Sequence, residues 1–116
     1  MQDIIIQINN FLKKNAWCDF EVIEFKAVLK IGGKTSFENK YDIIIIFEDV
    51  YFFQCLTNWK TETNSESFLI PSIVEQRKIN IHYQIERGHQ LVKILAEDVE
   101  GAMYISARKV SVEFLK

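Results

Sequence analysis

Long stretches of the chain after residue 20 alternate apolar and polar side chains, and this two-residue rhythm constrains the fold more than any other sequence feature. Successive side chains of a β-strand point to opposite faces, so the rhythm predicts strands with one buried and one solvated face. It is clear at 23–31, 79–85 and 103–108. Because short turns join only antiparallel neighbours, we expect an antiparallel sheet.

The first predicted strand covers 23–31, and its upstream end is ambiguous. Phe20 and Val22 have the opposite parity, so either the strand begins at Ile23 or a bulge near Val22 shifts its phase. The next residues, Gly32 to Thr35, are predicted to form a hairpin turn, because adjacent glycines accept the positive φ angles of such turns.

The segment Tyr41–Phe47 is apolar on both faces and rich in isoleucine, which is typical of a strand at the centre of a covered sheet. The apolar residues resume at 50–55, and either a tight reversal at Glu48 and Asp49 or a continuous bent strand is compatible with them. The polar stretch 56–66 has no period and is predicted to be the longest loop. Residues 68–75 stay open between helix and strand, since Pro71 suits the start of either.

The C-terminal third predicts several short strands linked by turns, which would form a meander. In order, the expected elements are strands at 79–85, 90–97, 103–108 and 110–114, with turns at 87–89 and 98–101.

The N-terminal segment 3–16 has a different period, with apolar residues three and four positions apart. They are Ile4, Ile5, Ile8, Phe11, Leu12 and Ala16. This spacing predicts an amphipathic helix that lies on the sheet. The expected fold is therefore α+β and mainly β: one N-terminal helix packed on an antiparallel meander that forms a curved sheet, a partly open barrel or a two-layer sandwich. Residues 1–116 are expected to form a single domain.

Composition argues against several classes of protein. A formal net charge of −2 gives no field that would attract nucleic acid. The chain has no apolar run long enough to cross a bilayer, and its first residues lack the pattern of a signal peptide. We therefore expect a soluble cytoplasmic protein with no membrane or nucleic-acid partner. Cys18 and Cys55 are expected to be free, buried thiols.

No motif for catalysis, cofactor binding or metal binding is present. His82 and His89 are too few for a zinc site and are expected to be solvated. Cys55 and His82 can be paired as nucleophile and base, but no neighbouring residue predicts an activated thiol. We expect no catalytic residue, cofactor or metal.

Aromatic residues are concentrated in the middle of the chain, next to the polar stretch 56–66. Tyr51 and Phe52 are adjacent and cannot both face one interior, and Trp59 falls in the predicted loop. With the acidic Glu62 and Glu66, these residues form the predicted partner-binding surface.

The strings Trp17–Phe20 and Ile43–Val50, together with the order of a short helix and a strand-rich body, resemble small bacterial β-rich domains of unknown function. Some of those domains resemble polymorphic-toxin immunity proteins. In them an Asp after an aromatic or His residue often precedes the first strand; here Asp19 follows Cys18, where His is commoner.

The resemblance implies a non-catalytic cytoplasmic domain that binds another protein, such as a toxin. One alternative is a small-molecule binder or an enzyme that uses a cavity inside a curved sheet or barrel. The other is an assembly subunit, a homodimer, in which an exposed strand edge pairs with its own copy.

Overall fold

The chain forms a seven-stranded antiparallel sheet with two helices, seen in a computed structural model that describes residues 1–61 and 63–115. The helices are α1 (Gln2–Lys13) and α2 (Ile73–Tyr83). The strands are β1 (Cys18–Phe25), β2 (Val28–Lys34), β3 (Ile43–Gln54), β4 (Asn58–Thr61), β5 (Phe68–Leu69), β6 (Gln90–Ile94) and β7 (Met103–Phe114). The predicted class, α+β and mainly β with an N-terminal helix, is confirmed.

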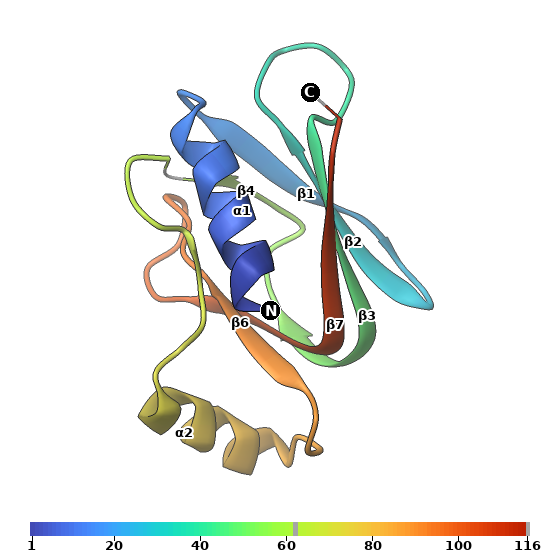
Figure 1. Cartoon of the computed structure of the whole chain (residues 1–116), viewed down its shortest axis with the longest axis vertical. Helices are drawn as coiled ribbons and strands as arrows, with labels where there is room; N and C mark the ends of the chain where they lie inside the picture. Colours follow the sequence, from blue (N-terminus) through green and yellow to red (C-terminus); the bar gives the residue numbers. More distant parts are fainter. Residues whose placement is uncertain (62, 116) are drawn as a thin grey trace.

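The strand order is β4-β1-β2-β3-β7-β6-β5, and all neighbouring pairs are antiparallel. Strands that follow one another along the chain are neighbours in two groups, β1-β2-β3 and β5-β6-β7, which are joined where β3 pairs with β7. The turn-linked meander expected at 79–114 is only partly present, because helix α2 separates β5 from β6 and one strand, β7, covers 103–114. Strand β4 crosses back to pair with β1. The whole sheet curls into a half-barrel (Figure 1).

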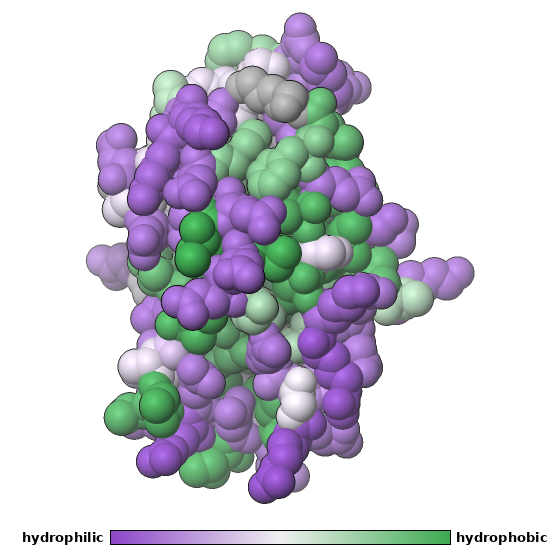
Figure 2. All heavy atoms as spheres, in the orientation of Figure 1, coloured by the Kyte–Doolittle hydropathy of each residue, from purple (hydrophilic) through white to green (hydrophobic). Residues whose placement is uncertain are grey.

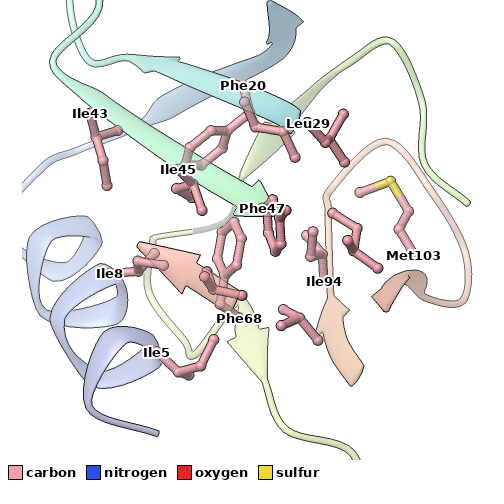
Figure 3. Packing of buried hydrophobic residues seen from close by; sticks show 14 of the residues in the cluster. Ile5, Ile8, Phe20, Leu29, Ile43, Ile45, Phe47, Phe68, Ile94 and Met103 are labelled. Atoms are coloured by element: carbon pink, nitrogen blue, oxygen red, sulfur yellow. The ribbon is translucent and has the colours of Figure 1, made fainter. Parts of the chain in front are cut away.

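Helix α1 lies against the inner side of this curl, where it packs on β5 and β7 (Figure 1). Its Ile5, Ile8 and Leu12 are buried, as the helical spacing predicts. Figure 3 shows these isoleucines facing buried side chains of the strands, which include Phe20, Leu29, Ile45, Phe47, Phe68 and Ile94. Full burial of one such side chain contributes about 1.5–3 kcal/mol, so this cluster holds α1 to the sheet.

The predicted strand at 23–31 and the turn after it are wrong. The chain reverses between β1 and β2 at Lys26 and Ala27, and the two glycines lie inside β2. They are needed for close approach: a Cβ at Gly33 would lie 2.7 Å from the side chains of Ile43 and Phe20. Of the two alternatives for the upstream end, the bulge near Val22 is the one observed, as a register shift between Val22 and Glu24.

Strand β3 is one continuous bent strand rather than two strands joined by a reversal. Asp49 has a positive φ of 54°, and the register against β7 shifts between Val50 and Phe52. Strand β7 likewise runs unbroken through the two segments expected at 103–108 and 110–114. These two long strands form the seam between the halves of the sheet.

The predicted strand at 79–85 is wrong, because residues 73–83 form helix α2. The open segment 68–75 contains the short strand β5 and the start of this helix. The turn expected at 87–89 is present, with Gly88 at φ 97°.

The predicted loop 56–66 contains strand β4, so that expectation is wrong for 58–61. Strands β4 and β5 are the two edges of the sheet, and the outward backbone groups of one residue in each, Lys60 and Phe68, are hydrogen-bonded. At β4 the Asp98 carboxylate accepts the Lys60 N–H at 3.2 Å, and the Lys60 carbonyl accepts the Glu97 N–H at 3.0 Å. At β5 the Asn9 amide accepts the Phe68 N–H at 3.2 Å and donates to the Phe68 carbonyl at 2.8 Å.

The helical spacing places Asn9 on the polar side of α1, yet this side chain is only 6% exposed. Its amide copies the donor and acceptor that a neighbouring strand would offer to Phe68. Edge groups engaged in this way are not free to pair with a second copy of the chain.

Candidate docking face on helix α2

Helix α2 begins and ends at well-defined caps. The Ser72 hydroxyl accepts the Glu75 N–H at 3.2 Å, which satisfies one of the unpaired donors of the first turn. The Gln76 side chain donates to the Pro71 carbonyl at 2.7 Å. At the other end Gln84 adopts the left-handed conformation that commonly terminates helices. Local sequence therefore fixes the length of this helix.

Polar contacts hold the first half of α2 to the sheet. The Glu75 carboxylate lies 3.0 Å from the Lys93 ammonium of β6 and accepts the Tyr104 hydroxyl of β7. These hydrogen bonds lower the pKa of Glu75. Partial burial and the same carboxylate raise the pKa of Tyr104 to about 12. At neutral pH the carboxylate is therefore charged and the phenol is protonated, which is the pairing that this contact needs.

Aromatic contacts hold the other end of α2. The Phe52 ring stacks on Tyr83 with centroids 4.1 Å apart, and the Tyr51 hydroxyl donates to the Gln84 carbonyl at 2.8 Å. The register shift between Val50 and Phe52 makes Tyr51 the extra residue of β3, and both adjacent aromatics reach α2.

The outward side of α2 is apolar and basic, and no residue of this helix is fully buried. Ile73 is 68% exposed, Val74 64% and Ile81 77%, and Arg77 and Lys78 between them are also exposed. We call these five residues the α2 docking face. At the lower end of the molecule, where α2 lies in Figure 1, Figure 2 shows apolar surface interspersed with polar surface.

The docking face results from placing an alternating sequence in a helix. Ile79 and Tyr83 are four residues apart and share the side that faces the sheet. Ile81 is two residues from each, a rotation of about 200°, which turns it away from the sheet. Ile73, Arg77 and Ile81 are spaced by four and form one line along that outward side. The aliphatic side chains are therefore exposed because of the helical geometry, without local unfolding.

The structure separates the residues of the predicted partner-binding surface. Tyr51 and Phe52 lie together against α2. Trp59 is in β4, stacked on Phe20 and only 2% exposed, so the expectation that it is an exposed loop residue is wrong. Glu66 is exposed beside α1, in a hollow lined also by Lys13. Glu62 lies outside the described residues.

The α2 docking face was not predicted from the sequence, although one signal was available. Ser72 followed three residues later by Glu75 is the pattern that starts many helices, and Pro71 precedes it. That signal conflicts with the two-residue rhythm at 79–85, and the capping pattern prevails in the structure.

The cysteines, His82 and candidate metal ligands are the other residues of the described part of the chain that the sequence analysis considered for reactive chemistry. Cys18 is buried and Cys55 is half-buried, and burial raises the pKa of Cys55, which disfavours the reactive thiolate. His82 is exposed on α2 and packs against Tyr83. Within residues 1–61 and 63–115, no three side chains of His, Cys, Asp or Glu gather in a group that could hold a metal ion.

The inner side of the curled sheet, where the alternative prediction places a ligand cavity, is filled by the cluster that includes α1. Hollows are found at the surface, such as one of about 450 Å³ between α1 and Phe114. Neither helix in the described part of the chain has the length and apolar character that crossing a membrane requires. Comparisons with protein families, with curated proteins and with solved structures find no match for the chain.

Proposed function

We propose that this chain is a non-catalytic cytoplasmic domain that binds another protein across the α2 docking face. The observation that carries the proposal is the exposure of Ile73, Val74 and Ile81 on a helix whose opposite side is already anchored. Clustered exposed aliphatic residues commonly mark interaction surfaces. A capped, anchored helix also loses little conformational freedom on docking, which favours binding.

The resemblance to immunity proteins implies that the partner is a toxin, and this identity of the partner remains a prediction. The docking face replaces the surface predicted around Trp59, because a side chain that is 2% exposed cannot anchor a partner. Tyr51 and Phe52 keep a supporting role, since they fix the end of α2.

Site-specific photo-crosslinking tests the proposal. A photoreactive residue replaces Ile81 in the native cell, and a second variant carries it at the exposed Lys26 of the β1–β2 turn as a control. The crosslinked protein is identified, purified and titrated against wild type and the double variant Ile73→Gln/Ile81→Gln. Loss of two buried aliphatic contacts should weaken binding by at least about tenfold, with an unchanged unfolding midpoint.

Equal crosslinking from position 26 and position 81 would overturn the proposal. The proposal would also be overturned if the dissociation constant of the double variant stayed within about twofold of wild type, since loss of a true anchor residue weakens binding far more than that.

A further inference from the structure

The charge on the α2 docking face is one-sided. Arg77 and Lys78 are exposed, and neither takes part in an ion pair with any residue in 1–61 or 63–115. The acidic residue of α2 and the first acidic residue after it both have a cationic neighbour: Glu75 pairs with Lys93, and Glu86 lies 3.6 Å from Arg108. Two positive charges therefore sit among three exposed aliphatic side chains.

The order of these residues defines a pattern that a partner has to match. Ile73 and Ile81 are eight residues apart, about 12 Å along the helix axis, and Arg77 lies midway in the same line. Val74 and Lys78 form the adjacent line, one turn apart. A complementary surface thus needs an acidic group about one helical turn from each of two apolar contacts.

From this pattern we infer that the docking face takes an acidic amphipathic helix of a partner protein, with aliphatic residues on successive turns and Asp or Glu between them. The inference rests on the proposed function. A second copy of this chain fits poorly, because a two-fold interface across α2 would place Arg77 and Lys78 near their own copies. A lipid surface fits less well, since helices that lie in membrane interfaces bury Trp, Phe or Leu, and the outward side of α2 has only Ile and Val.

Two synthetic helical peptides test the inference. Both carry Leu at the same two positions, two turns apart, and they differ only in having Glu or Lys at the positions between and beside the leucines. Binding is followed by NMR shifts of the backbone amides of 73–82. The Glu peptide should bind about tenfold more tightly than the Lys peptide, since it exchanges repulsion for attraction at two cationic sites.

Charge reversal supplies the matched control. Arg77→Glu/Lys78→Glu should invert the preference between the peptides, whereas Lys13→Glu/Lys14→Glu, which makes the same change in net charge at the exposed end of α1, should leave it unchanged. Ile73→Gln/Ile81→Gln should weaken both peptides alike.

The outcomes separate this inference from the proposed function. If both peptides bind equally and charge reversal has no effect, but the isoleucine variant still loses binding, the acidic partner is refuted and the docking face stands. If neither peptide shifts the amides of 73–82, both are refuted. Binding to phosphatidylglycerol vesicles that the isoleucine variant abolishes, or dimers in sedimentation that it dissociates, would assign the face to lipid or to a second copy and overturn the inference.

Discussion

Substitution of Asn9 by Ala tests how much of the protein's stability depends on the two hydrogen bonds between Asn9 and Phe68 at the β5 edge. The amide of Asn9 makes two buried hydrogen bonds to one residue, 3.2 Å from the Phe68 N–H and 2.8 Å to the Phe68 carbonyl. Alanine removes both partners and leaves two backbone groups of a fully buried residue unpaired. Each such group costs about 1–3 kcal/mol, so the expected loss for the two groups is about 2–6 kcal/mol. That is a large part of the 5–15 kcal/mol, roughly, that stabilises an ordinary domain.

Urea unfolding followed by tryptophan fluorescence measures the free energy, with Asn10→Ala as the matched control. Asn10 is the next residue of the same helix and is exposed, so its substitution should change stability by less than about 0.5 kcal/mol. If the change in stability of Asn9→Ala also stays within that range, the hydrogen bonds of the Asn9 amide to Phe68 do not stabilise the fold, and the prediction is refuted.

Asn9→Asp separates the acceptor from the donor. The carboxylate can still accept the Phe68 N–H, but its second oxygen faces the Phe68 carbonyl and repels it. The protonated acid restores a donor there, so folding raises the pKa of the new carboxyl. Relative to wild type at the same pH, Asn9→Asp should therefore gain stability as pH falls through that raised pKa, and a difference that does not depend on pH would refute the geometry.

Two further predictions concern other parts of the fold. Gly33→Ala should lower the free energy of unfolding by about 1–3 kcal/mol or more, because the new Cβ meets the buried Ile43 and Phe20. In urea unfolding this loss should exceed that of Gly32→Ala, whose neighbours Tyr41 and Ile23 are less buried and can move. The lowered pKa of Glu75 means that its contribution to stability is present above its ordinary value of 4.5 and is lost as pH falls through the lower folded value. Glu75→Gln should thus be destabilised at pH 7 and approach wild type as pH falls through that lowered pKa, as measured by urea midpoints; a gap that stays constant would contradict the role of this carboxylate.

The sequence predicted the fold class well because the class depends on periods that persist over many residues. The spacing of Ile5, Ile8 and Leu12 specifies a helix face, and the run 41–47 specifies a central strand, whatever the partner elements are. Where two local signals conflicted, the prediction failed. At 79–85 the alternation favours a strand, but the cap at Ser72 and the contact of Tyr83 with Phe52 favour a helix.

The remaining errors arise from contacts between distant segments. The glycines of β2 look like a turn until Phe20 and Ile43 are known to lie against Gly33. The burial of Trp59 depends on β4 crossing back to β1, which no local pattern specifies. The capping pattern at Ser72 could have indicated helix α2, but the side of the helix that faces the sheet depends on contacts of Glu75 with Lys93 and Tyr104, which no local pattern specifies.

The hydrogen-bonded positions on the two edge strands have a consequence for the proposed binding function. Backbone pairing at a strand edge is largely indifferent to sequence, but at Phe68 and Lys60 the side chains of Asn9 and Asp98 already bond outward backbone groups. In the proposed function, specificity would lie in the side chains on the exterior of α2, so a few point changes there would exchange one partner for another while the hydrogen-bonded frame stays intact.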